Sequence, residues 1–442
     1  MKMKMFGLVT VMLGLTAAKL PAQTNNLIYN FSYGSASHPR AGLILSGNTL
    51  YGTTYDMGNG ASAFKLNTDG TGFTVLHSFD FTGNSGHPKA SMLLSGNILY
   101  GTTISTVFKV NTDGSDFTLL KYLSGSDGTD LRAGLVLDNN TLTLYGTSYA
   151  GGSSNNGTIF KINTDGTGFA TLHNFINTPD GTGPQAGLVL NGNTLYGTTY
   201  NGGSSSNGVV FKINTDGTGY AVLYNFTNNP DGANPQGDLV LSAGTLYGTT
   251  ENGGSSGYGT VFKINTDGTG YAVLKNFTSW PDGANPQAGL LLRGNTLYGT
   301  TYYGGSSNYG GGSSGDGTVF EINTDGTGYA VLENFLGYGY SDGANPAANL
   351  VLGSNGLYGT TYSGGTGNGT IFRLTLAPPQ LQITSAGNMP VVFWQDDGFS
   401  RTLQTTTNLQ SGKWTTVSNG VSLIGLQVTN LSNPPDAFFR LQ

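Results

Sequence analysis

The chain contains no cysteine, and charged side chains are scarce. Only 10% of its 442 residues are charged, against roughly a quarter in an average soluble domain. Without cysteine, the chain has no disulfide, no thiolate metal site, no cysteine nucleophile and no lipid-modified cysteine. The net charge of −6 is mild and gives no basic surface for nucleic acid. We therefore expect no nucleic-acid partner.

Long hydrophobic runs are also missing beyond the first residues. Lys2 and Lys4 precede an apolar run from Phe6 to Ala18, and small residues stand at Ala17, Ala18 and Ala22. This order is typical of a secretory signal peptide, whereas the run is too short to span a bilayer comfortably. The sequence predicts a signal peptide over 1–22, export to the cell surface or beyond, and no membrane span in the mature chain. A buried N-terminal helix is the alternative.

Glycine, in contrast, is abundant, with 72 residues, and it punctuates an internal repeat. The phrase Leu-Tyr-Gly-Thr-Thr/Ser occurs seven times, at spacings of 45 to 60 residues. Its tyrosines are Tyr51, Tyr100, Tyr145, Tyr196, Tyr247, Tyr298 and Tyr358. Each unit holds four short runs rich in Thr, Tyr, Phe, Val and Ile, separated by Gly, Asn, Asp and Pro. Such runs indicate strands, here called a to d in order along each unit.

Four strands per unit, seven times over, predict an all-β, seven-bladed β-propeller over 24–376. The chain opens with a d run, Leu27 to Phe31, and its last unit ends after a c run, Ile371 to Leu374. These incomplete ends are complementary. We therefore expect the N-terminal strand to pair with the last c strand and complete blade seven, which would remove the open sheet edges.

Each b strand contains a glycine. A glycine inside a strand usually marks a place where another group packs close to the backbone. We expect the seven Tyr-Gly pairs to be core, with the tyrosine of one blade resting on the glycine backbone of the next. The acids of the c–d turns, such as Asp216 before Gly217, are predicted to be turn formers.

The repeat resembles a known family. The phrases AGLVLNGNTLYGTTYNGGS and GVVFKINTDGTGYAVLYNF, at 186–204 and 208–226, look like the GloVer tandem repeat, named for Gloeobacter and Verrucomicrobia. The resemblance covers about 27–374. It implies a secreted bacterial repeat protein with a C-terminal anchoring or sorting module, and it implies no enzymatic activity. A weaker similarity to kelch blades concerns the fold alone.

The segment Ala377-Pro378-Pro379 is predicted to be a linker. The residues after it no longer show the repeat. Five short apolar runs follow, separated by turns. We predict a small immunoglobulin-like or fibronectin-like β-sandwich over 380–442, with Phe393, Trp394, Trp414 and Phe439 in its core. The phrases LQTTTNLQSGKWTTV and AFFRLQ resemble C-terminal modules of secreted Verrucomicrobia proteins. The role of this module stays open among sorting, anchoring and adhesion.

Binding residues are expected on the face that carries the long d–a and b–c loops, around the central channel, because function usually lies on long loops. The candidate ligand-binding residues are Trp280, Asp180, Asp231, Asp282, Asp342, Tyr149, Tyr200, Tyr302 and Tyr362, with Asp127 and Tyr55 in equivalent positions. Aromatic and carboxylate groups together suit sugars. Alternatively, each aspartate caps its own turn and each tyrosine is packing.

Signals for catalysis and metals are weak. His77 and His173 occupy a variable position of strand d that we expect to be solvated, and His38 and His87 precede proline where other blades have asparagine. None belongs to a triad or zinc pattern. We predict no catalytic residue, no metal site and no cofactor.

The sequence favours a secreted, non-catalytic propeller that binds glycan or extracellular protein through its long-loop face. One alternative is a polysaccharide-active lyase or glycosidase, which would need two suitably spaced carboxylates in one pocket, or a Tyr or His base near cations. A structural spacer is the other. The ligand and the oligomeric state stay open.

Overall fold

The structure is a computed structural model. It describes residues 25–376, apart from 33–36, 56–59, 80–85, 307–314 and 338–341, and beyond 381 it describes strands alone. The predicted signal peptide and the linker at Ala377-Pro378-Pro379 lie outside the described residues, as do Trp394 and Trp414. In the described part, no helix is long and apolar enough to cross a membrane.

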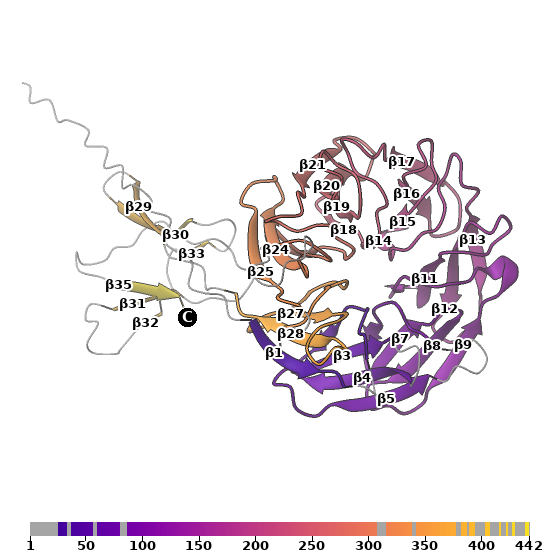
Figure 1. Cartoon of the computed structure of the whole chain (residues 1–442), viewed down its shortest axis with the longest axis horizontal. Helices are drawn as coiled ribbons and strands as arrows, with labels where there is room; N and C mark the ends of the chain where they lie inside the picture. The colour runs from indigo at the N-terminus through magenta and orange to yellow at the C-terminus, as the bar shows by residue number, and fades with distance from the viewer. Residues whose placement is uncertain are drawn as a thin grey trace, which may run out of the picture.

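Seven four-stranded antiparallel sheets form a closed ring of blades, which confirms the predicted all-β propeller (Figure 1). Each sheet of blades one to six uses four consecutive strands in order from a to d. Blades one to three comprise β2 (Ile44–Ser46), β3 (Thr49–Thr54), β4 (Ala61–Asn67), β5 (Thr74–Phe79); β6 (Leu93–Ser95), β7 (Ile98–Thr102), β8 (Thr106–Asn111), β9 (Thr118–Tyr122); and β10 (Val136–Asp138), β11 (Thr143–Ser148), β12 (Thr158–Asn163), β13 (Ala170–Asn174).

The remaining blades repeat the same pattern. They comprise β14 (Val189–Asn191), β15 (Thr194–Thr199), β16 (Val209–Asn214), β17 (Ala221–Asn225); β18 (Val240–Ser242), β19 (Thr245–Thr250), β20 (Thr260–Asn265), β21 (Ala272–Asn276); β22 (Leu291–Arg293), β23 (Thr296–Thr301), β24 (Thr318–Asn323), β25 (Ala330–Asn334); and β26 (Val351–Gly353), β27 (Gly356–Thr361), β28 (Thr370–Leu374), with β1 (Asn25–Asn30). One 3-10 turn, η1 (Gly125–Asp127), interrupts the loop before blade three.

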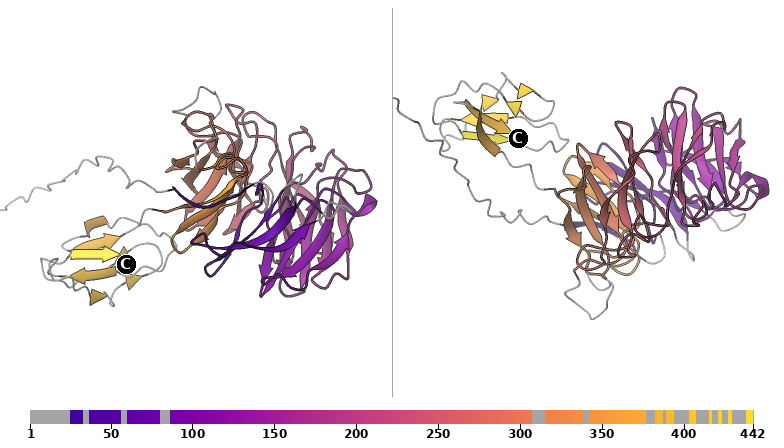
Figure 2. Two further views of the ribbon diagram at one scale, coloured as in Figure 1. Left: turned by 60° about the horizontal axis from the view of Figure 1, so that its bottom comes forward. Right: turned by 90° about the horizontal axis from the view of Figure 1, so that it is seen from above.

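The ring closes through the N-terminal strand, as the sequence predicted. Strand β1 pairs antiparallel with β28, with Leu27 opposite Phe372 and Asn30 opposite Thr370. Figures 1 and 2 show these two strands, from opposite ends of the repeat region, side by side. Phe31, just after β1, is 1% exposed and joins a core cluster with residues of blades one and seven. The closing strand is therefore anchored by core packing as well as by the ladder.

The seven repeat tyrosines are buried, as expected, but their neighbour differs from the prediction. Tyr196 packs in a cluster with Leu246 and Phe262 of the next blade. A Cβ on Gly197 would lie 2.6 Å from Cζ of Phe211, the residue opposite it on strand c of its own blade. The prediction that the tyrosine of the preceding blade rests on this glycine was wrong, because the nearest atoms belong to Phe211 and Leu188. The ring of Phe211 fills the space instead, because cross-strand pairing places phenylalanine opposite glycine.

The c–d turns are built by their aspartates, as predicted. The Asp216 carboxylate accepts hydrogen bonds from the backbone N–H and the hydroxyl of Thr218, at 2.8 and 2.7 Å. These bonds lower the pKa of Asp216. Gly217 follows with φ of +89°, a conformation that glycine adopts readily.

The C-terminal residues form two small antiparallel sheets. One contains β29 (Gln382–Ala386), β30 (Met389–Phe393), β33 (Val421–Ser422) and β34 (Gln427–Val428), and the other β31 (Leu403–Thr406), β32 (Thr415–Thr416) and β35 (Phe438–Leu441). The predicted side-chain core, including Phe393 and Phe439, lies outside the described part of the chain. The sandwich and its boundaries stay a prediction.

Candidate binding site at the channel mouth

A cavity of about 240 Å³ lies where the seven d–a loops enter their innermost strands. In each of these loops, the residue after the proline position lines the cavity. Six of these seven residues are long and polar. The seven are Arg40, Lys89, Arg132, Gln185, Gln236, Gln287 and Ala347, in the order of blades one to seven. We call this set the mouth ring. It lies on the predicted long-loop face, around the predicted channel.

A shared backbone conformation aims these side chains. Two positions before each mouth-ring residue, the backbone has φ between +54° and +65°, at His38, His87, Asp130, Gly183, Asn234, Asn285 and Asn345. Asparagine, aspartate and glycine tolerate this left-handed region best, and proline follows in six of the seven loops. The turn directs the chain into strand a and points the residue after proline at the channel.

The same turn ties the mouth ring to the residue after strand b. The Tyr200 backbone N–H donates to the Gly183 carbonyl at 3.1 Å, and equivalent bonds join Tyr55 to His38 and Tyr302 to Asn285. Asn285 in turn donates through Nδ2 to the carbonyl of Glu251 in the preceding blade, at 3.0 Å. These bonds place the predicted tyrosines next to the mouth ring and link neighbouring blades.

Threonines of strand b bond to the backbone that leads into strand a of the next blade. The hydroxyl of Thr147 donates to the Ala186 carbonyl of the next blade, at 3.3 Å. Thr249 makes the equivalent bond to Ala288, at 3.0 Å. Because these alanines directly follow the mouth-ring residues Gln185 and Gln287, the bonds fix the backbone on which the mouth ring is mounted.

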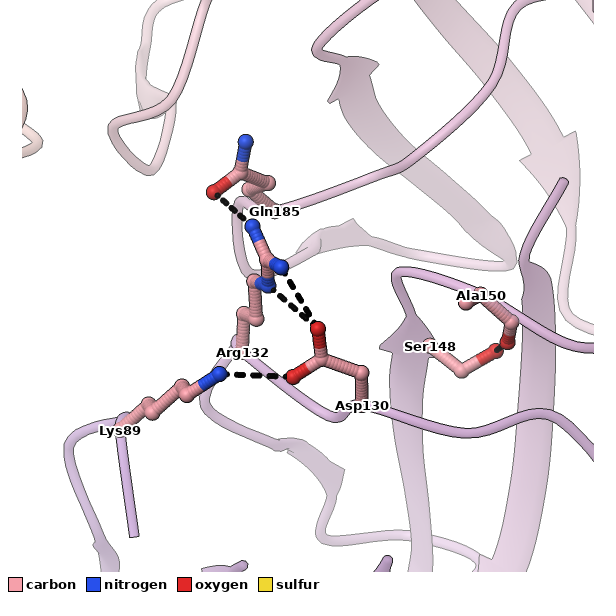
Figure 3. Close-up of polar contacts among 6 residues, drawn as sticks. All are labelled: Lys89, Asp130, Arg132, Ser148, Ala150 and Gln185. Atoms are coloured by element: carbon pink, nitrogen blue, oxygen red, sulfur yellow. Dashed lines mark hydrogen bonds and ion pairs between the residues drawn. The ribbon is translucent and has the colours of Figure 1, made fainter. Parts of the chain in front are cut away.

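Three neighbouring blades contribute cations to one side of the mouth. Asp130 accepts a hydrogen bond from Lys89 at 2.8 Å and two from Arg132, at 2.6 and 2.9 Å (Figure 3). Arg132 also donates to Gln185 at 3.1 Å and lies 3.5 Å above the Tyr149 ring centre. Although burial opposes it, the bonds from Arg132 and Lys89 hold the pKa of Asp130 below its ordinary value. Two cations thus share one carboxylate.

Arg40 completes the cationic side. Its guanidinium carbon lies 4.5 Å from the Tyr362 ring centre and 5.2 Å from that of Tyr55. Among the described residues, no carboxylate lies within ion-pair distance of Arg40, and the side chain is exposed. Its positive charge is therefore held by aromatic faces rather than by an acid.

The opposite side of the mouth carries acids and amides. Glu251 accepts a hydrogen bond of 2.7 Å from the Tyr200 hydroxyl and one of 2.9 Å from Gln287 Nε2. Burial, followed by the neighbouring Glu251 carboxylate, raises the pKa of Tyr200. The phenol therefore stays protonated and acts as a donor to Glu251.

Two side chains meet across the channel just inside the mouth. Asn349 of blade seven donates through Nδ2 to Asp238 of blade five, at 2.7 Å. The backbone N–H groups of Gly187 and Gly289 donate to Asp238 and to Asn349 Oδ1, respectively. This crossbar adds polar groups to the cavity lining and joins four consecutive blades.

The predicted aspartates lie in the d–a loops but bond within them. Asp231 is 6% exposed and accepts hydrogen bonds from the N–H and hydroxyl of Thr227, at 3.0 and 2.7 Å, and from the hydroxyl of Tyr224 at 2.6 Å. Asp282 makes the same contacts with Thr278 and pairs with Lys275. Equivalent contacts occur at Asp180, and Asp342 accepts from the Leu336 N–H. These contacts favour the turn-capping alternative.

The solvated position expected for two histidines was wrong. His173 bonds to Asp180 at 2.8 Å and stacks on Tyr220 of the next blade, with ring centres 4.0 Å apart. His77 stacks on Phe117 at 3.5 Å. Strand d is the outermost strand, yet the aromatic residue before the next blade's strand d covers this position. In the described part of the chain, no group of three His, Cys, Asp or Glu residues could hold a metal ion.

Trp280 is 69% exposed, early in the d–a loop before blade six, and it does not line the cavity. Tyr55 lines it directly, Tyr149 and Tyr362 hold its arginines, and Tyr302 packs edge-on against Tyr303, with centres 4.7 Å apart. Sequence reasoning missed the mouth ring itself. The available signal was a single position, after the proline in six of the seven loops, whose side chain changes from cation to amide to alanine while the residue after it is alanine in six blades.

The repeat is the feature by which the chain can be classified. Residues 103–311 match the family model of the Gloeobacter/Verrucomicrobia repeat. This agrees with the resemblance seen in the sequence, whereas the kelch-like detail is not confirmed. No curated protein matches the chain in sequence.

Solved structures resemble this chain in fold. An oligogalacturonate lyase in complex with manganese has a TM-score of 0.51 at 11% identity, over 81% of this chain and 97% of the lyase chain. The extracellular domain assigned to a hybrid two component system of B. thetaiotaomicron has a TM-score of 0.53 at 11% identity. That match covers 84% of this chain but only 44% of the other. At these identities the similarity concerns the propeller fold alone.

Proposed function

We propose that the protein is a secreted propeller that binds glycan, without cleaving it, at the channel mouth of its long-loop face. The observation that carries the proposal is the mouth ring. Seven equivalent loop positions converge on one cavity, and six of them carry Arg, Lys or Gln. Fork-shaped and amide side chains beside tyrosine rings suit the hydroxyl groups and flat faces of sugars.

Departure from symmetry supports a ligand site over a spacer. The core positions repeat almost unchanged around the ring, with tyrosine before glycine in every b strand. The mouth ring, in contrast, changes from cations in blades one to three to amides in blades four to six and alanine in blade seven. A ligand with two different ends needs such asymmetry, whereas packing alone does not.

A glycan array with the purified mature protein tests the proposal, followed by calorimetric titration of the strongest ligand. Gln236→Ala should lower the affinity for that ligand roughly two- to tenfold, which is the loss expected for one hydrogen bond. Asn193→Ala is the matched control, because Asn193 is exposed on an a–b turn at the opposite face. Equal affinities for Gln236→Ala and the parent protein, or an array without any ligand, would refute glycan binding at this site.

The same incubation separates binding from the lyase or glycosidase alternative. Mass spectrometry of the ligand after prolonged incubation should find it intact. Shortened or unsaturated products would establish an enzyme on the propeller scaffold.

Export is the second part of the proposal, supported by the basic, apolar and small-residue order of residues 1–22. The mature protein should begin between Lys19 and Gln23 and be found outside the cytoplasm. Mass spectrometry that finds Met1 on the extracellular protein would contradict this expectation.

A further inference from the structure

The charges at the channel mouth are distributed unevenly. Arg40, Lys89 and Arg132 come from three adjacent blades and line the same cavity. The acids Asp238 and Glu251 both belong to blade five, and each already accepts two hydrogen bonds from the protein. The mouth therefore has a cationic side and a side whose acids are occupied.

The cationic side keeps an excess of positive charge. Asp130 is shared by Lys89 and Arg132, which leaves one net positive charge in that group. Arg40 adds a second, and in the part of the chain that the structure describes it has aromatic neighbours in place of a carboxylate. The Tyr55 ring centre lies near both groups, 5.2 Å from the Arg40 guanidinium carbon and 5.9 Å from Lys89 Nζ.

We infer that the cationic side is a carboxylate subsite, so that the glycan bound at the mouth is an acidic saccharide that contains uronate residues. This inference rests on the proposed function and specifies its ligand class. A planar carboxylate matches the two-pronged donor geometry of Arg40. Lys89 supplies a second cation near the same tyrosine, with its Nζ 5.9 Å from the Tyr55 ring centre. Tyr55 lines the cavity beside these cations, and Gln185 and Gln236 continue the lining beyond Arg132.

The chain itself offers the matched substitution. Arg40→Gln places in blade one the residue that blades four to six carry at the equivalent position. It removes the charge and keeps a polar side chain of similar reach. Lys212→Gln is the charge-matched control, since Lys212 lies near the Asp267 turn of the next blade on the opposite face.

The test uses calorimetric titration with defined probes: oligosaccharides of glucuronate and of galacturonate, each with its methyl-esterified form, and a sulfated neutral oligosaccharide. We expect at least one uronate probe to bind parent protein and Lys212→Gln equally, and its ester to bind about tenfold more weakly. Arg40→Gln should bind the acid about tenfold more weakly than the parent does, and its affinity for the ester should fall less than twofold. Affinity for the acid should also fall as salt rises.

The outcomes separate the two proposals. If acid and ester bind equally and Arg40→Gln changes neither, the mouth binds glycan but the carboxylate subsite is wrong. Preference for the sulfated probe over every uronate would likewise overturn the carboxylate assignment. If no saccharide binds at all, the proposed function fails together with this inference.

Discussion

Asn349 and Asp238 join across the central channel through a hydrogen bond of 2.7 Å, although 111 residues separate them in the sequence. Both residues line the mouth cavity, and the bond connects blade seven to blade five. Both residues occupy a position that is glycine in four of the other five blades and serine in the remaining one. This contact is therefore a local departure from the repeat.

Asp238→Ala should destabilise the protein by about 1–3 kcal/mol, because it leaves the Gly187 N–H and the Asn349 amide without their acceptor. Thermal or denaturant unfolding measures the change. Ser91→Ala, at the equivalent position of blade two, is the control and should stay within about 0.5 kcal/mol of the parent. Equal unfolding free energies for Asp238→Ala and Ser91→Ala would show that the crossbar contributes nothing.

Gly197→Ala should cost about 1–3 kcal/mol or more, because its Cβ would lie 2.6 Å from Phe211 and 2.9 Å from Leu188. Chemical denaturation gives the value. Gly192→Asn is the control, since Gly192 has φ of +57°, a Cβ added there would meet no atom within 4 Å, and asparagine tolerates this conformation. A neutral Gly197→Ala variant would mean that the Phe211 ring can move aside.

The seam between blades six and seven carries an unusual acid pair. In blades four and five, the fourth residue of strand d donates to the loop aspartate, as Tyr224 does to Asp231 and Lys275 to Asp282. In blade six the equivalent residue is Glu333, which faces Asp342. Burial, followed by the Asp342 charge, raises the pKa of Glu333 from 4.5 to about 7. Burial also raises the pKa of Asp342, with Asp316 adding to the effect.

A raised carboxyl pKa means that the folded protein holds the proton more tightly than the unfolded chain does. Its stabilising contribution is present below pH 4.5 and is lost as the pH rises through about 7. We expect unfolding free energy to fall over this window by on the order of 2 kcal/mol. Glu333→Gln should flatten the profile and raise stability at pH 8.

Melting temperatures of parent and Glu333→Gln at pH 5 and pH 8 measure this effect. Glu333→Lys is a second variant, because it copies the Lys275–Asp282 pair and should stabilise the seam at pH 8 more than glutamine does. Identical pH profiles for the parent and both variants would contradict the pairing of Glu333 with Asp342.

Trp280→Ala should leave stability within about 0.5 kcal/mol, because the side chain is 69% exposed. The substitution should lower the affinity for glycans that are long enough to extend from the mouth over this loop. The loss should be roughly two- to tenfold, because stacking on the indole is removed. Titration of short and long forms of one ligand measures the difference. Equal affinity of the variant and the parent for the long form would remove Trp280 from the binding surface.

The seven blades and their closure could be predicted because their signals are local and repeated. The turn residues Asp216 and Gly217, the run at Val209–Asn214 and the complementary strand at the N-terminus each specify one element without tertiary information. The loop face and the tyrosines around the mouth followed from the blade geometry.

The partner of Gly197 could not be predicted, because it depends on which residue of strand c lies opposite, and the register places Phe211 there. The orientation of the mouth ring depends on the left-handed residue two positions earlier. That residue is histidine, aspartate, glycine or asparagine in different blades, so no single residue type marks it in the sequence. The covered position of His173 required knowing that Tyr220 of the next blade reaches back over it.

A crystal structure of the protein with its highest-affinity uronate oligosaccharide tests the channel-mouth site most directly. We predict ligand density in the cavity, with a carboxylate within hydrogen-bond distance of Arg40, a sugar ring against Tyr55, and a hydroxyl bonded to Gln236. An empty cavity in crystals that hold the ligand on another surface of the propeller, or on the C-terminal sheets, would contradict it.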